Sequence, residues 1–382
     1  MKTAIVVGAG LAGITAAQKL SDDGYQVELL EERPHIGGNV YDFKSDAGIL
    51  NQKYGAHIFH TKSRTVMEYL KKYSDFFEYR HKVLGEIDGK LVPIPFNLQS
   101  LSLLFPEKEA AIIRELLLQS YGYGAKIPIS DLRKNINCEI QKLADFIYEK
   151  VFLHYTEKQW QMKLEELDPD VGARVPVVIS DETGYFDDEY QCMPIQGFTE
   201  MCNRMLQSPL IHTTLACDAL DLISMDASGN MYFKGEKCEC PVIYTGCLDR
   251  LFRYQLGTLP YRSLDFEYVE LPKGEYQSIG VINYPNEHRY TRIIEFKHFT
   301  GKYDNQSTDI AYEYPCNFDD GKIPYYPVPQ KKNRDLYDKY AKRAQAYPNL
   351  ILLGRLAEYK YYNMDQVISS ALKTISQLLG RR

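Results

Sequence analysis

A glycine-rich turn near the start of the chain has the spacing of a dinucleotide-binding site. Gly8, Gly10 and Gly13 form a G-x-G-x-x-G motif between a β-branched run and a helical pattern, and Glu31 ends the next predicted strand. The first glycine permits a tight turn, the second lets the backbone approach a pyrophosphate, and the helix N-terminus attracts its charge. An acid at the end of the second strand can accept hydrogen bonds from ribose hydroxyls. The motif and its context therefore predict a bound dinucleotide.

Two further segments indicate that this dinucleotide is FAD. Segment 32–39, ERPHIGGN, places an acid and an arginine before a Gly-Gly pair, and it resembles flavoproteins of the glutathione-reductase and amine-oxidase type. Segment 354–365, GRLAEYKYYNMD, reads as Gly-Arg, a loop and the start of a helix capped by Asp365. The resemblance to these flavoproteins implies that the positive end of that helix points at the flavin, where it would stabilise negative charge on the reduced form. Both ends of the chain are thus expected to build one FAD domain around an inserted middle.

The stretch EKVFLHYTEKQW, 149–160, ends on the only tryptophan of the chain. Phe152, Tyr155, Thr156 and Trp160 follow one another at roughly helical spacing. Such a row is either a core stripe or one wall of a pocket for a flat ligand. The stretch alone does not decide between the two.

Composition excludes several classes. The formal net charge of −6 argues against a nucleic-acid partner, and no apolar run is long enough to span a membrane. We read the first residues as a strand and not as a signal peptide. Eight cysteines without a C-x-x-C pair indicate reduced thiols in a cytoplasmic protein, and no metal site is expected. The 31 tyrosines suit polar ligands such as sugars and phosphates.

The periodicity of the middle predicts an α/β fold in which a Rossmann-like FAD-binding domain carries an inserted α-helical domain and an antiparallel β-sheet domain. The expected boundaries are 1–77 plus 196–244 plus 316–382 for the FAD domain, 78–150 for the helical domain, and 151–195 plus 245–315 for the sheet domain.

Segments along nearly the whole chain resemble the UDP-galactopyranose mutase family. They are YGAHIFHT (54–61), VFLHYTEKQW (151–160), LDPDVGARVPV (167–177), YFDDEYQCMP (185–194), LPYRSLDFE (259–267), YTRIIEFKHF (290–299), EYP (313–315) and GRLAEYKYYNMD (354–365). The resemblance implies a homodimer that interconverts UDP-galactopyranose and UDP-galactofuranose for surface glycans. It also implies that N5 of reduced FAD attacks the anomeric carbon while UDP leaves, with NAD(P)H or a reductase as external reductant.

The same resemblance assigns site residues. It implies catalytic roles for Arg174, Arg292, Arg250 and His60, with Arg174 and Arg292 on the diphosphate. It implies substrate binding by Phe152, Tyr155, Thr156, Trp160, Tyr185, Asn283, Tyr314, Tyr361 and Asn363. It implies FAD binding by Gly8, Gly10, Ala12, Gly13, Glu31, Glu32, Arg33, Gly38, Asn39, Tyr54, His57, Gly354, Arg355, Met364 and Asp365.

Three departures from the family pattern bear on the substrate. The family has Pro in place of Ala56, Gly-Leu in place of Gln161-Met162, and Asp in place of Asn363. These changes leave open a related substrate, UDP-N-acetylgalactosamine or dTDP-fucose. Two other classes stay open, an FAD-dependent oxidoreductase of the amine-oxidase type and an inactive sugar-nucleotide binder.

Overall fold

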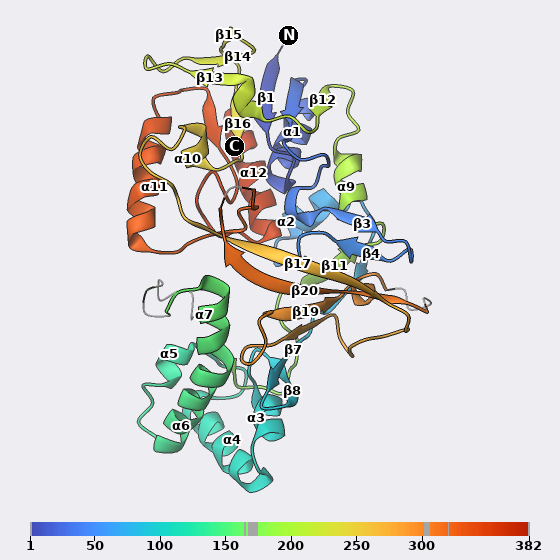
Figure 1. Ribbon diagram of the computed structural model, residues 1–382, viewed down its shortest axis with the longest axis vertical. Coiled ribbons are helices and arrows are strands. Elements are labelled where there is room, and N and C mark those ends of the chain that lie inside the picture. Colours follow the sequence, from blue (N-terminus) through green and yellow to red (C-terminus); the bar gives the residue numbers. More distant parts are fainter. Residues whose placement is uncertain (1, 164–165, 167–174, 302–305, 320, 381–382) are drawn as a thin grey trace.

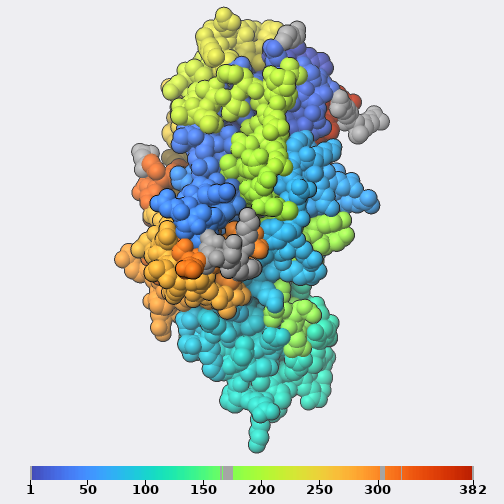
Figure 2. Space-filling view, turned by 90° about the vertical axis from the view of Figure 1, so that its right-hand side faces the viewer, coloured from blue at the N-terminus to red at the C-terminus, as the bar shows by residue number. Residues whose placement is uncertain are grey.

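The computed structural model describes residues 2–163, 166, 175–301, 306–319 and 321–380. The molecule is elongated, with a parallel sheet at one end, a group of helices at the other and a second sheet between them (Figure 1). Figure 2 shows the same order from the side, with the helical residues forming the narrow end. Among the described residues, no helix is both long and apolar enough to cross a membrane.

The parallel sheet is the Rossmann-like part. In order across the sheet, its strands are β12 (Ile211–Thr214), β2 (Gln26–Leu30), β1 (Thr3–Val7), β16 (Val242–Tyr244) and β22 (Leu350–Leu352).

Alternate residues of these strands face two different helix layers. Val6, Leu29 and Ile243 belong to the core shared with α1 (Leu11–Asp22), α9 (Phe198–Met205) and α12 (Met364–Leu378). Ile5 and Tyr244 belong to the core shared with α10 (Leu248–Leu251) and α11 (Lys331–Ala344). The sheet is therefore covered on both faces, as parallel sheets require, and the predicted fold class is confirmed.

The second sheet joins the two ends of the molecule. Its order is β21 (Tyr326–Pro327), β17 (Tyr261–Leu271), β20 (Thr308–Asn317), β19 (Arg292–Glu295), β18 (Val281–Asn283), β7 (Val83–Ile87) and β8 (Lys90–Ile94). The pairing is antiparallel except between β18 and β7, which run parallel. The sheet is thus mixed where the sequence predicted an antiparallel one.

The helical part packs around its own apolar core, which includes Leu101, Ile113, Leu143 and Ile147. Its helices are α3 (Leu98–Leu104), α4 (Glu107–Tyr121), α5 (Ile129–Leu132) and α6 (Cys138–Ile147), continued by the π-helical turn η2 (Tyr148–Leu153) and by α7 (His154–Trp160). The smaller elements are α2 (Arg64–Leu70), the 3₁₀ turns η1 (Gly38–Val40), η4 (Ala219–Asp221) and η5 (Phe296–Phe299), and the strands β3 (Asp42–Lys44), β4 (Leu50–Gln52), β5 (Phe59–Thr61), β6 (Phe76–Glu78), β9 (Lys126–Ile127), β10 (Val177–Val178), β11 (Tyr190–Pro194), β13 (Ile223–Met225), β14 (Met231–Phe233) and β15 (Glu236–Cys238).

Two segments differ from the predicted secondary structure. Strands β7 and β8 lie within 78–150, which was expected to be helical. Val83 and Ile87 alternate with less buried residues, and the Asp88-Gly89 turn has positive φ at both residues, the hairpin signal that the helical interpretation missed. Conversely, residues 151–160 were assigned to the sheet domain, but η2 and α7 continue the helical part through them. The domain boundaries themselves stay a prediction.

Candidate active site

A long cleft runs along the carboxyl ends of the parallel strands, with a cavity volume of about 650 Å³. This is the edge at which parallel sheets bind nucleotides. The predicted cofactor residues that line it are Gly8, Gly10, Ala12, Glu31, Glu32, Arg33, Gly38, Asn39, Tyr54, His57, Gly354, Arg355 and Met364. The structure thus brings together both ends of the chain, as a single dinucleotide site requires.

Glycines let the walls of this cleft approach one another. A Cβ atom on Gly38 would lie 2.8 Å from the Cα of Gly10, and one on Gly354 would lie 3.0 Å from the Cβ of Ala12. Gly13 does not line the cleft. A Cβ there would lie 1.9 Å from the carbonyl oxygen of Gly8, so this glycine allows the helix to pack on the strand.

Glu31 is fixed by backbone donors at the end of β2. Its carboxylate accepts hydrogen bonds from the N–H of Ala9 at 2.6 Å and of Arg33 at 2.9 Å. Burial raises the pKa of Glu31, and the two N–H donors oppose that rise. Since the side chain lines the cleft and retains further lone pairs, it can also accept from ribose hydroxyls. The donor set and the glycine-lined walls fit a dinucleotide.

His57 and Arg355 stand where the cleft approaches a second pocket. His57 Nδ1 donates to the carbonyl of Gly55 at 2.9 Å, and burial lowers the pKa of His57 to about 4. The imidazole is therefore neutral at pH 7. The guanidinium of Arg355 lies 4.8 Å from the ring centre of Tyr361 and 5.6 Å from that of Tyr326. Arg355 lines the cleft while both tyrosines line the second pocket, so the two spaces meet at this side chain.

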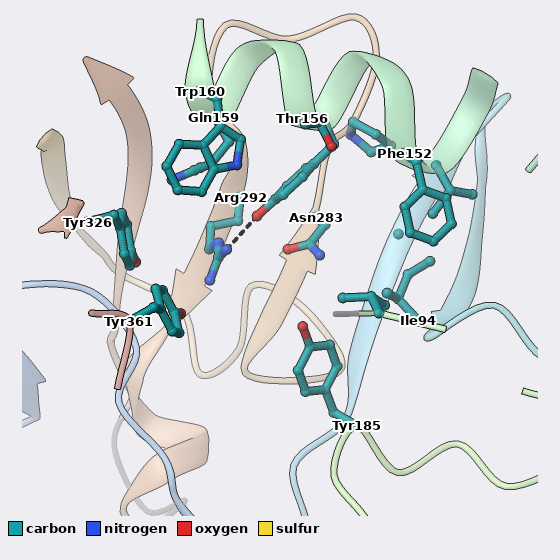
Figure 3. Close-up of a pocket in the computed structure, with 15 residues that line it drawn as sticks. Ile94, Phe152, Thr156, Gln159, Trp160, Tyr185, Asn283, Arg292, Tyr326 and Tyr361 are labelled. Carbon is teal, nitrogen blue, oxygen red and sulfur yellow. Dashed lines mark hydrogen bonds between the residues drawn. The ribbon is translucent and has the colours of Figure 1, made fainter. Parts of the chain in front are cut away.

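The second pocket has a cavity volume of about 190 Å³ and lies between α7 and the mixed sheet (Figure 3). Eight of the predicted site residues line it: Phe152, Tyr155, Thr156, Trp160, Tyr185, Asn283, Arg292 and Tyr361. The row of aromatic side chains ending at Trp160 is thus a pocket wall as well as buried surface, which answers the question that the sequence left open. Their individual roles stay predictions.

Among the residues that the structure describes, Arg292 is the arginine that lines this pocket. Its Nη2 donates to the hydroxyl of Tyr155 at 2.5 Å, and its Nε lies 3.1 Å from Oε1 of Glu313. Burial by itself would lower the pKa of Arg292, but Glu313 and Tyr155 raise it well above its usual value. The guanidinium is held charged and oriented, and it offers planar donors to an anion.

Tyr314 does not line the pocket, which differs from the place expected of a substrate residue. Along β20 successive side chains point to opposite faces, and Glu313 faces Arg292. Tyr314 therefore points to the other face, where its hydroxyl donates to Glu267 at 3.0 Å.

Tyr314→Phe is accordingly expected to keep both the turnover number and the affinity for substrate within about twofold of the unaltered enzyme, because it removes only a surface hydrogen bond. Steady-state kinetics check this. A decrease of tenfold or more in the turnover number or in the affinity for substrate would show that Tyr314 belongs to the substrate site.

Arg250 also lies elsewhere than expected. It lines the long cleft, not the second pocket, and its guanidinium binds Glu32 at 2.6 Å and Asp218 at 2.7 Å. This pairing places Arg250 beside the cofactor cleft, and the catalytic role that the resemblance implied for it stays a prediction.

His60 and the start of α12 require further corrections. His60 is not among the residues that line either pocket; its Nδ1 donates to Asp188 at 2.8 Å and its ring stacks on Phe186, the neighbour of Tyr185. It therefore supports the segment that carries Tyr185. The residue that caps α12 is Asn363, not Asp365, and Asp365 accepts from Thr61 at 3.0 Å.

Asn363 lines neither pocket. Asn and Asp cap helices about equally well, so either residue would serve as the N-cap of α12. Arg174 lies outside the described residues.

The sequence missed seven of the residues that line this pocket, and two of them, Tyr326 and Gln159, carry polar or aromatic side chains. Tyr326 stacks on Tyr361 with ring centres 5.6 Å apart and also approaches Trp160 at 6.3 Å. Gln159 lies one helical turn after Tyr155, so helical spacing could have predicted it. No local sequence pattern predicts Tyr326 as a pocket residue, because it comes from β21 at the edge of the mixed sheet.

Comparisons with known proteins agree with this geometry. A family model described as "GLF: UDP-galactopyranose mutase" matches residues 150–361, and one described as an NAD(P)-binding Rossmann-like domain matches 6–73. The chain is 35% identical to the UDP-galactopyranose mutase of Mycoplasma pneumoniae, over 98% of this chain and 96% of the relative. The chain belongs to the UDP-galactopyranose mutase family.

Members of this family are isomerases, and the chain is an isomerase of this type. It is also 29% identical to a dTDP-fucopyranose mutase from Escherichia coli, over 98% of this chain and 97% of the relative. A crystal structure of reduced UDP-galactopyranose mutase has the same fold, with a TM-score of 0.76, 16% identity and coverage of 100% of this chain and 96% of the other. The shared Rossmann-like fold and the cleft indicate a flavin cofactor.

Proposed function

We propose that this chain interconverts UDP-galactopyranose and UDP-galactofuranose and that its flavin is FAD, active when reduced. The observation that carries the proposal is the junction at Arg355, where the dinucleotide cleft meets a pocket with a charged arginine and several tyrosines. A pocket of that chemistry suits a diphosphate attached to a sugar.

The chain's own residues bind, orient and neutralise charge. Arg292 meets the diphosphate, and its hold matters most when UDP leaves and negative charge builds on the outer phosphate. Trp160 and Phe152 bury the base, while Tyr185, Tyr326 and Tyr361 exclude water and offer hydroxyls around the phosphates and sugar. When bound and reduced, the flavin supplies a nucleophilic nitrogen, which is chemistry that the side chains lack.

The wider setting is part of the proposal. The enzyme works in the cytoplasm as a homodimer, takes electrons from NAD(P)H or a reductase, and supplies furanosyl nucleotides for surface glycans. The proposal for this setting rests on the family resemblance.

Two alternative functions are weighed against it. The same pocket chemistry with dTDP-fucose is favoured by the relative from Escherichia coli, although its identity of 29% is below the 35% of the mycoplasmal enzyme. An amine-oxidase-type reaction is less supported. The amino-acid oxidases that resemble the chain cover only about half of it, 48% for one from Lachesis muta, and a charged Arg292 does not suit an apolar substrate.

A substrate panel tests the proposal. Flavin-loaded protein is reduced with dithionite and incubated with UDP-galactopyranose, UDP-N-acetylgalactosamine or dTDP-fucose, and the products are separated by chromatography. We expect a furanose product from UDP-galactopyranose at the highest rate. Conversion of dTDP-fucose alone would show that dTDP-fucose is the substrate in place of UDP-galactopyranose. If none of the three sugar nucleotides is converted, the mutase function is rejected.

Trp160 provides a direct report of binding. It is the only tryptophan, it is 7% exposed, and it lines the pocket beside Tyr326. UDP is expected to change its fluorescence emission, whereas galactose alone is not, because only the nucleotide reaches this wall. Unchanged emission at saturating UDP would show that the base does not bind against α7.

A further inference from the structure

The helical segment 148–160 presents two neighbouring faces with different partners. The pocket face carries Val151, Phe152, Tyr155, Thr156, Gln159 and Trp160. The adjacent face carries Lys150, His154 and Lys158, which recur every four residues and so lie one above another on a helix. This second face contacts the segment that joins β18 to β19.

The contacts between this face and the joining segment 284–291 form what we call the interlock. Lys158 Nζ donates to the carbonyl of Tyr284 at 2.5 Å and to that of His288 at 2.9 Å. His154 Nδ1 donates to the side chain of Asn286 at 3.0 Å. The amide nitrogen of Asn286 then donates to the carbonyl of Lys150 at 3.2 Å.

The segment held by the interlock is flanked by two pocket residues, Asn283 and Arg292. Asn283 and Arg292 are direct partners across β18 and β19, and Tyr284 N donates to the carbonyl of Thr291 at 2.9 Å. Across the pocket, Arg292 reaches the hydroxyl of Tyr155 on the helix. The interlock therefore joins the two elements that carry Tyr155 and Arg292.

Lys158 is unusual for a lysine on a helix. It is partly buried, and among the described residues it forms no ion pair within salt-bridge distance. Burial alone lowers the pKa of Lys158 to about 8. Partial desolvation of an ammonium is costly, and hydrogen bonds to the two carbonyls offset part of that cost.

We propose that Lys158 is a positioning residue that fixes the spacing between the helix and strand walls of the pocket and so sets the affinity for the nucleotide diphosphate. This role rests on the proposed function. Lys158 touches no described pocket space itself, since it is not among the lining residues. It acts through Tyr155 and Arg292.

Lys158→Met tests this role, with UDP binding measured by calorimetry on the flavin-loaded protein. We expect UDP to bind about 10- to 100-fold more weakly, which is the worth of charge-assisted hydrogen bonds. KM should rise more than the turnover number falls. Lys158→Arg, which keeps a charged donor, should recover part of the affinity. Lys142→Met is the control, because Lys142 forms a surface ion pair with the exposed Glu139 on α6.

Asn286→Ala is an independent variant in case Lys158→Met does not fold. It removes the other two contacts of the interlock and should also weaken UDP binding while flavin content stays unchanged. Affinities within about twofold of the unaltered protein for both variants would overturn the positioning role. Failure of the unaltered protein to bind UDP would instead overturn the proposed function, and with it this role.

Discussion

Replacing Arg292 by alanine is expected to slow turnover by about 30- to 1000-fold at saturating substrate, because a charge-assisted contact in a closed site is worth about 2–4 kcal/mol in the transition state. The described structure gives the physical reason. Arg292 is oriented by Glu313 and Tyr155 and points into the pocket where UDP would leave. Single-turnover and steady-state rates of the reduced variant measure the effect.

Two companion variants separate catalysis from folding. Arg292→Ala leaves the Glu313 side chain, which is 4% exposed, without its cation, and this can destabilise the protein. Arg292→Ala combined with Glu313→Gln removes that charge and should restore the melting temperature but not the rate. Arg289→Ala, on the exposed part of the same hairpin, is the control and should be near normal. A near-normal rate for Arg292→Ala would show that Arg292 does not bind the diphosphate during the reaction.

Gly10→Ala is expected to reduce flavin affinity by about 10- to 100-fold while the apoprotein keeps its stability. The added methyl group would meet only the Cα of Gly38, at 3.9 Å, so it fits within the protein. It would, however, stand in the wall that a pyrophosphate must approach. Flavin titration of the apoprotein and its melting temperature give the two readouts.

Gly13→Ala is the matched contrast, because its methyl group would collide with the carbonyl oxygen of Gly8 at 1.9 Å. It should therefore destabilise the fold itself. If Gly10→Ala bound flavin normally, the pyrophosphate would not cross this turn. If it melted as early as Gly13→Ala, the loss of flavin would be an effect of folding.

The features that the sequence predicted well are set by local spacing. Gly8, Gly10 and Glu31 lie within one β–turn–α–β unit, so their meeting in the cleft follows from chain geometry. Phe152 and Thr156 reach the pocket because helical periodicity places them on one face.

The errors arose where long-range contacts decide. Whether Glu313 or Tyr314 lies on the same face of the sheet as Arg292 depends on the register of β20, and a shift of one residue reverses the choice. The place of Arg250 beside the cofactor cleft has no local signal, because its partner Glu32 is distant in sequence and becomes a neighbour only when the parallel sheet forms. Tyr326 comes from β21, the short edge strand, which has no clear sequence signal. These positions are fixed by tertiary structure and not by local pattern.

The most direct test of the central claim is the number of furanose molecules formed per reducing equivalent. Flavin-loaded protein is given one equivalent of dithionite without oxygen and then excess UDP-galactopyranose, and the product is counted against an oxidised sample. A mutase should form many product molecules per equivalent, keep its flavin reduced and show little activity when oxidised. One product per equivalent, or equal activity in the oxidised sample, would contradict a redox-neutral mutase that depends on reduced flavin.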